Sequence, residues 1–273
     1  MSTLTEADYR AYVEAFNRSD YPAFSSLYAD DVEFHGRAAR LTGREAIVTH
    51  YRKVKARLKE TLTPHAIVVS GNTIVADVET ELTALEDWPD FPTGAFNRGD
   101  TRRSQNFLWY DIEGAQFKRI RSARYRLLAP DEVVPNVEAK ADKGITAERF
   151  RTYIDAFNRD DYATFGAFYH EEVVLVIAGK RELRGTDAIF DFYRTVKAQT
   201  RRTIEIVALI SSGNQLAVEL QSEFLALQDL PTFAAGPMKK GGRIFINTVV
   251  LYELRDGKFT RIRSAELQKI NRP

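Results

Sequence analysis

Apolar and polar residues alternate along much of the chain, a pattern typical of strands that bury one face. The clearest case is the stretch Ile-Val-Ala-Asp-Val-Glu-Thr-Glu-Leu at residues 74–82, where apolar side chains fall on one face and acidic side chains on the other. We therefore expect one face of this strand to be buried and the other to be hydrated or paired with basic residues.

A helical pattern precedes the strands in each half of the chain. Thr5 and Thr146 are suited to cap the N-termini of helices that run to about Asn17 and Asn158, because a threonine hydroxyl can accept from a free backbone N–H. Helices followed by meandering strands predict an α+β fold, with three helices packed on a curved sheet. The remaining elements are expected as short helices around 24–28 and 165–169, strands from about Val32 and Val173, third helices at 45–58 and 187–200, and four strands after each.

The two halves of the chain repeat each other. Tyr-Val-Glu-Ala-Phe-Asn-Arg-Ser-Asp-Tyr at 12–21 returns as Tyr-Ile-Asp-Ala-Phe-Asn-Arg-Asp-Asp-Tyr at 153–162, and Arg-Ile-Arg-Ser-Ala at 119–123 returns at 261–265. Similarity over this span indicates a duplicated domain. The proline-containing, charge-rich segment 129–144 is predicted to link a first domain, 1–128, to a second, 145–273.

Composition narrows the possible functions. The 39 basic and 38 acidic residues nearly cancel, so neither nucleic acid nor an anionic membrane is an expected partner. No apolar run is long enough to span a membrane, and the first residues lack the pattern of a secretory signal, so we expect a cytoplasmic protein. The absence of cysteine excludes disulfides, thiolate nucleophiles and zinc-cysteine sites.

Two motifs stand out in the first copy: the stretch 12–31, which ends in Leu-Tyr-Ala-Asp-Asp, and Gly-Arg-Glu-Ala-Ile at 43–47 with Tyr51. They resemble motifs of a known superfamily, the group of ketosteroid isomerases, SnoaL-like polyketide cyclases and nuclear transport factor two. The first resembles the opening two helices of the isomerase, and the second resembles its third helix. The resemblance covers nearly all of both copies. It implies two tandem cones (α+β barrels), each with three N-terminal helices on a strongly curved, mixed or antiparallel sheet around a pocket.

The resemblance also implies roles for tyrosines. A tyrosine of the isomerase's first helix donates a hydrogen bond to the developing enolate and is backed by two more tyrosines. Those positions match Tyr12, Tyr28 and Tyr51, and in the second copy Tyr153, Tyr169 and Tyr193. The alternative is that these tyrosines are core aromatics whose hydroxyls are satisfied by neighbours.

Both acidic positions of the isomerase are replaced. Its catalytic aspartate aligns with Gly36 and about Ile177, and its second acid aligns with Leu108 and Val250. Steroid isomerisation by the family's aspartate base is therefore not supported.

Other polar groups are candidates for the first pocket. Asn106 and Tyr110 share a strand face with Leu108, so Asn106 could be a second hydrogen-bond donor to substrate. His35 lies beside the missing base and is a candidate to move protons near neutral pH, unless its side chain points away from the pocket. Between two later strands, Trp88, Phe91 and Phe96 are candidates to hold a flat ligand or, alternatively, to bury a domain contact.

Two functions remain open from the sequence. The first is a cofactor-independent isomerase, cyclase, dehydratase or lyase that acts on a small hydrophobic, aromatic or polycyclic compound by proton abstraction and oxyanion stabilisation in the first copy. Its predicted catalytic residues are Tyr12, His35 and Asn106, and no metal pattern accompanies them. The second is a non-catalytic module that binds a small molecule or docks a protein. The resemblance further implies that the copies pair as an internal pseudo-dimer, with higher oligomers possible.

Overall fold

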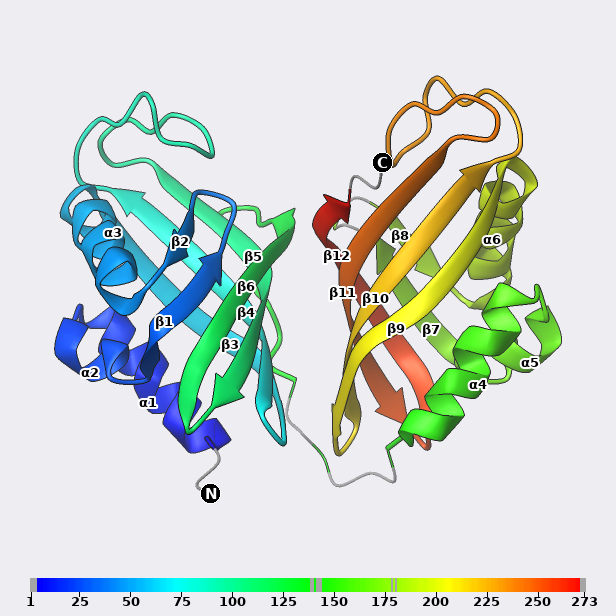
Figure 1. Ribbon diagram of the computed structural model, residues 1–273, viewed down its shortest axis with the longest axis horizontal. Coiled ribbons are helices and arrows are strands. Elements are labelled where there is room, and N and C mark those ends of the chain that lie inside the picture. Colours follow the sequence, from blue (N-terminus) through cyan, green and yellow to red (C-terminus); the bar gives the residue numbers. More distant parts are fainter. Residues whose placement is uncertain (1–3, 138–139, 141–143, 178, 180, 271–273) are drawn as a thin grey trace. The chain divides into compact units, whose positions relative to one another are not determined.

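The computed structural model of the chain describes residues 4–137, 140, 144–177, 179 and 181–270 (Figure 1). It divides into two compact units, Met1–Ala139 and Lys140–Pro273. The predicted linker, 129–144, lies in part outside the described residues.

Helices open the first unit. The Thr5 hydroxyl accepts from the backbone N–H of Asp8, and the Asp8 carboxylate accepts from the backbone N–H of Thr5, so the predicted cap of the first helix is confirmed. Lys55 donates to the carbonyl of Phe16 at the other end of that helix. The helices are α1 (Glu6–Asn17), α2 (Tyr21–Ser25) and α3 (Arg44–Arg57).

The strands of the first unit form one six-stranded sheet in the order β2-β1-β6-β5-β4-β3. Strands β1 and β6 pair in parallel and the other neighbours are antiparallel, which confirms a mixed sheet. Shifts of register, including one between Pro64 and Ala66, mark bulges, which bend strands and increase their twist. The strands are β1 (Tyr28–His35), β2 (Arg40–Thr42), β3 (Leu58–Ser70), β4 (Thr73–Ala84), β5 (Thr101–Glu113) and β6 (Gln116–Leu127).

The second unit repeats this arrangement, which confirms the tandem α+β fold. Its sheet has the order β8-β7-β12-β11-β10-β9, and the Thr146 hydroxyl caps its first helix. Its elements are α4 (Ala147–Asn158), α5 (Tyr162–Gly166), β7 (Tyr169–Ile177), β8 (Arg181–Arg184), α6 (Thr186–Gln199), β9 (Thr200–Ser212), β10 (Gln215–Ala226), β11 (Arg243–Arg255) and β12 (Lys258–Ile270).

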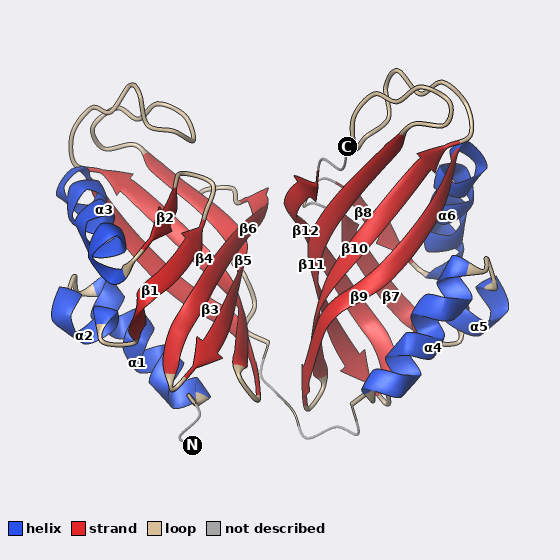
Figure 2. Ribbon diagram, viewed as in Figure 1, coloured by secondary structure: helices blue, strands red, loops and turns tan. Residues whose placement is uncertain are grey.

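In each unit the helices pack on one face of the curved sheet (Figure 2). The core of the first unit lies between them, where aromatic residues of α1 such as Tyr9 and Phe16 meet Ile74 and Val78 of β4. Burial of such side chains stabilises the unit by roughly 1.5–3 kcal/mol each.

One detail differs from the sequence-based expectation. The second helix is one short turn that ends at Ser25, where Ser26 follows as its C-cap, and Tyr28 already begins β1. Just after β6, the chain contacts the first unit: Arg103 donates to the carbonyls of Ala129 at 3.2 Å and Pro130 at 2.6 Å.

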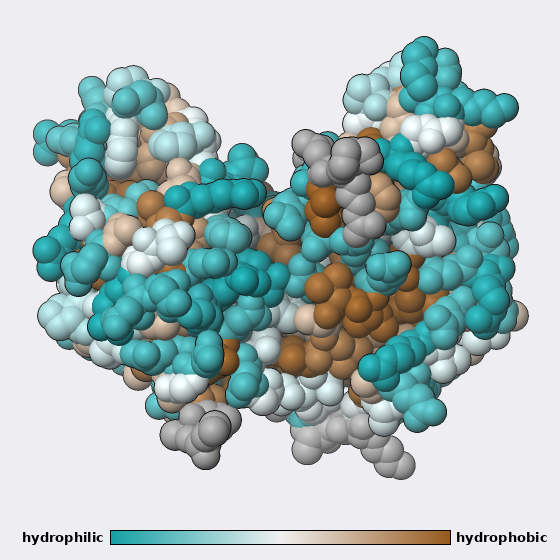
Figure 3. Space-filling model, viewed as in Figure 1, coloured by the Kyte–Doolittle hydropathy of each residue, from teal (hydrophilic) through white to brown (hydrophobic). Residues whose placement is uncertain are grey.

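The visible surface is largely hydrophilic, with an apolar patch on the second unit over β9 and β10 (Figure 3). Val207 of β9 is 51% exposed. No helix in the described ranges is long and apolar enough to cross a membrane.

Candidate functional site

The first unit contains a cavity of about 150 Å³ between its helices and its sheet. That volume is similar to that of an engineered protein cavity which holds benzene, about 150 Å³. Leu62, Leu108 and Phe91 contribute apolar wall, and the connections β1–β2 and β4–β5 contribute Arg37 and Thr93. The cavity therefore combines apolar walls with polar groups, as ligand sites do.

Buried tyrosines form two hydroxyl pairs, and each pair includes one residue that lines the cavity, Tyr12 or Tyr110. The Tyr12 hydroxyl lies 2.9 Å from that of Tyr28, and the Tyr9 hydroxyl lies 3.3 Å from that of Tyr110. Burial raises the pKa of Tyr12 to about 12, although its hydrogen bonds with Tyr28 and Tyr110 act in the opposite direction. These phenols are neutral at physiological pH, so Tyr12, which lines the cavity, can act as a hydrogen-bond donor.

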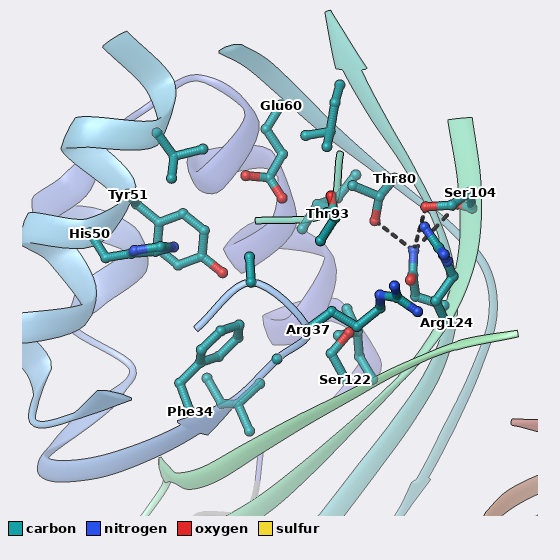
Figure 4. A pocket seen from close by; sticks show the side chains of 18 of the residues that line it. Phe34, Arg37, His50, Tyr51, Glu60, Thr80, Thr93, Ser104, Ser122 and Arg124 are labelled. Atoms are coloured by element: carbon teal, nitrogen blue, oxygen red, sulfur yellow. Dashed lines mark hydrogen bonds between the residues drawn. The ribbon is translucent and has the colours of Figure 1, made fainter. Parts of the chain in front are cut away.

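Glu60 supplies a carboxylate to the cavity. It lies on β3 between the buried residues Leu58 and Leu62, and strand alternation turns it to the same inner face. In Figure 4 its carboxylate and the Tyr51 hydroxyl both point into the cavity. Within the described residues, Glu60 has no hydrogen-bond or ion-pair partner, since the nearby Lys55 is directed to a backbone carbonyl.

The environment of Glu60 shifts the pKa of its carboxyl group toward neutral pH. Burial raises its pKa from 4.5 to about 7, and the charge of Lys55 offsets only part of that effect. Half-ionised at neutral pH, such a group can accept a proton and return it.

A polar cluster occupies another end of the cavity. The Asn106 amide nitrogen donates to the hydroxyls of Thr80 at 3.0 Å and Ser104 at 3.1 Å. In Figure 4, Arg37 and Arg124 lie near this polar cluster, whereas His50 and Tyr51 lie on the other side of the cavity. The end of the cavity away from Tyr51 is thus rich in hydrogen-bond donors.

The structure places the predicted residues unevenly. His35, predicted as the base, is not among the residues that line the cavity, because its neighbours Phe34 and Gly36 face inward; its Nε2 instead lies 3.8 Å from a Glu33 oxygen. The predicted residues that line the cavity are Tyr12, Tyr51, Phe91, Asn106, Leu108 and Tyr110. Tyr28 does not line it but contacts Tyr12, and Trp88 and Phe96 pack against Phe91. Tyr153 and Tyr169 lie in the second unit.

Sequence reasoning missed Glu60, Arg37 and Arg124. For Glu60 a signal was present: the alternation of Leu58, Glu60 and Leu62 puts one acidic residue on an apolar strand face. The positions of the arginines depend on the bend of the sheet and on the short connection after β1, which leave no comparable pattern.

The second unit has different groups at these positions. Arg202 stands where the first unit has Glu60, and it donates to the Ser222 hydroxyl at 3.2 Å. Its guanidinium lies 5.4 Å from the ring centre of Phe157 and 5.0 Å from that of Phe224. Asn106 and Ser104 are replaced by Thr248 and Ile246. The second unit therefore has a cation at the position of the first unit's carboxylate.

Within the described ranges, no group of three or more His, Cys, Asp or Glu side chains is placed to hold a metal ion.

These features define the class: two tandem α+β units with six-stranded sheets, the first of which contains a cavity lined by a carboxylate. The family model of the SnoaL-like domain matches residues 9–121 and, a second time, residues 150–262. The chain belongs to the SnoaL-like domain family. No curated protein matches it.

Solved structures resemble part of the chain. A putative polyketide cyclase from Xanthomonas campestris pv. campestris is 22% identical, with a TM-score of 0.38 over 42% of this chain and 86% of that one. One from Pseudomonas putida KT2440 is 23% identical, with a TM-score of 0.40 over 45% and 91%. An LEH-like epoxide hydrolase from M. tuberculosis is 15% identical, with a TM-score of 0.36 over 44% and 80%.

Proposed function

We propose that the first domain is a cofactor-independent enzyme that moves a proton on a small molecule with an apolar, aromatic body. The observation that carries this proposal is Glu60, an unpartnered carboxylate on the cavity wall whose pKa is raised to about 7. General bases work best when their pKa lies near the working pH, and burial provides that here.

The proposed first step is abstraction of a proton from a carbon next to a carbonyl. The C–H bond breaks, the proton goes to the Glu60 carboxylate, and the electron pair moves onto the carbonyl oxygen to give an enolate. Tyr12 donates a hydrogen bond to that oxygen, with Tyr28 holding its hydroxyl at 2.9 Å. Isomerisation, aldol cyclisation and elimination can each begin with this step, so the proposal leaves the product class open.

The second domain is proposed not to catalyse this step. Arg202 replaces Glu60, and a guanidinium stays protonated at all working pH values and cannot accept a proton. The rings around Arg202 suit a binding or supporting role for this domain.

Deuterium exchange tests the proposal without knowledge of the natural substrate. The protein is incubated with small aryl methyl ketones in D₂O, and loss of the methyl proton signal is followed by NMR. We expect Glu60→Gln to slow exchange by about 10²–10⁴-fold, the usual contribution of a general base. Arg202→Gln is the matched control and should exchange like the wild type.

Two outcomes would contradict the proposal. Exchange that is unchanged in Glu60→Gln would assign the base to another group. Binding of the ketones without exchange above background would favour the alternative, a module that binds a small molecule and does not transform it.

A further inference from the structure

The polar end of the first cavity carries an excess of positive charge. Arg37, Arg102 and Arg124 all line it, from the β1–β2 connection, β5 and β6. Among the residues that the structure describes, no carboxylate forms an ion pair with any of the three. Glu60, the acidic lining residue, lies apart from this end in Figure 4.

Arg102 has a structural role. Arg102 donates to the carbonyls of Thr93 at 3.1 Å and Ala95 at 3.1 Å, and its guanidinium lies 4.1 Å from the centre of the Phe96 ring. It therefore fastens the β4–β5 connection over the cavity. Its donors are largely used, but its charge remains.

Arg37 and Arg124 have no such task. No hydrogen bond from either guanidinium to another described residue is present; Arg124 is partly buried, and Arg37 is exposed. Burial lowers the pKa of Arg124, and the charges of Arg37 and Arg102 lower it further, so the three cations lie within electrostatic reach of one another. Like charges gathered in a partly apolar cavity are unfavourable unless an anion joins them.

The neighbouring groups suit an anion of a particular shape. A guanidinium donates two parallel hydrogen bonds to a planar carboxylate, and the hydroxyls of Ser104 and Thr80 lie beside Arg124 in Figure 4. Apolar wall from Leu108 and Phe91 remains for the body of the ligand.

We infer that the substrate of this cavity is a carboxylic acid: an apolar ring that carries one carboxylate, which Arg37 and Arg124 bind. The inference deepens the proposed function, because it names the class of molecule on which Glu60 acts. It also gives the ligand a direction, with the carboxylate at the arginine end and the reacting carbon toward Glu60 and Tyr12.

The second unit supports this assignment by contrast. Ile244 stands at the position of Arg102 and Glu266 at that of Arg124, so two of the three cations are absent there. The arginines accompany Glu60 in the same copy, as expected if base and anion site serve one ligand.

Matched ligand pairs test the inference. The probes are 3- and 4-acetylbenzoate and the corresponding acetylbenzamides, which have similar shape but no charge. Binding is measured by ligand-observed NMR titration, and exchange of the acetyl methyl protons is followed in D₂O. We expect each acid that binds to do so at least tenfold more tightly than its amide. Arg124→Gln and Arg37→Gln should each reduce that preference about tenfold.

The control is Arg40→Gln, because Arg40 is an exposed arginine three positions beyond Arg37 that does not line the cavity. It should leave the preference unchanged. Equal binding of acid and amide, including no binding by either, would overturn the inference, as would a preference that survives both arginine substitutions.

The two proposals fail separately. Carboxylate-selective binding that persists in Glu60→Gln, with no exchange in the wild type, would leave the anion site and remove the proposed catalysis. Exchange that depends on Glu60 but proceeds equally with acid and amide would leave the catalysis and remove the anion site.

Discussion

Glu60 of the first domain and Arg202 of the second occupy the same position of the fold. Glu60 pairs with Leu82 on the neighbouring strand, and Arg202 pairs with Phe224. Duplication has therefore kept the backbone and reversed the charge at the position that faces the interior of each cone. A proton acceptor is present in one copy and is replaced by a permanent cation in the other.

The tyrosine pairs allow the domains to be compared directly. Tyr12 and Tyr28 have hydroxyls 2.9 Å apart, and Tyr153 and Tyr169 have hydroxyls 3.1 Å apart, so removal of one hydroxyl has a similar structural cost in each. We expect Tyr12→Phe to slow exchange of an acetylbenzoate by roughly 10²-fold, the loss typical of one oxyanion donor. Tyr153→Phe should leave the rate unchanged, and equal losses would indicate two active sites or a purely structural effect.

The rate of exchange should depend on pH through Glu60. Because the folded-state pKa is about 7 and the ionised form is the base, kcat/KM should rise about tenfold per pH unit up to about 7 and then level off. A profile measured between pH 5 and 9 checks this. A rate already constant from pH 5 would mean that the acting base has an ordinary carboxylate pKa.

Glu60 should also make the fold less stable at high pH. Below about 4.5 it is protonated in both folded and unfolded chains; between about 4.5 and 7 only the unfolded chain releases the proton, so stability falls as pH rises. Above pH 7 the cost reaches up to about 3 kcal/mol.

Glu60→Gln removes that cost. Its Tm should match the wild type near pH 4.5 and exceed it at pH 8, by roughly 2–4 °C per kcal/mol. Thermal unfolding followed by circular dichroism at both pH values checks this. Glu113→Gln, at an exposed position at the end of β5, is the control and should show no such divergence. A Glu60→Gln variant less stable than wild type at pH 8 would contradict the half-buried, unpaired state of the carboxylate.

The fold could be predicted because its signals are local and repeated. The alternation of apolar and polar residues indicates the strands, Thr5 and Thr146 indicate the helix starts, and the internal repeat indicates two copies.

The residues of the site are harder to predict from the sequence. The imidazole of His35 has the chemistry of a base, but the direction of a strand side chain depends on register, and His35 is not among the residues that line the cavity. Glu60 lay in a readable pattern, yet its raised pKa depends on burial by residues distant in sequence.

The position of Glu60 depends on one side chain that the repeat preserves. Asn17, at the end of α1, accepts from the Leu62 N–H at 2.8 Å and donates to the Leu62 carbonyl at 2.9 Å, so it fixes β3 two residues from Glu60. Asn158 makes the same pair of bonds to Ile204, at 2.8 and 2.9 Å. Each asparagine side chain thus makes, with one residue of the edge strand, the two hydrogen bonds that a neighbouring strand would otherwise make.

Asn17→Ala should leave the Leu62 N–H and carbonyl without their partner and destabilise the first domain by about 1–3 kcal/mol. Because the same change frees β3 near Glu60, it should also slow exchange under conditions where the domain is still folded. Asn158→Ala should destabilise the second domain by a similar amount and leave exchange unchanged. Exchange of backbone amide hydrogens, followed by mass spectrometry, assigns each loss of stability to its domain. A loss of substrate exchange in both variants would show that catalysis needs the second domain intact.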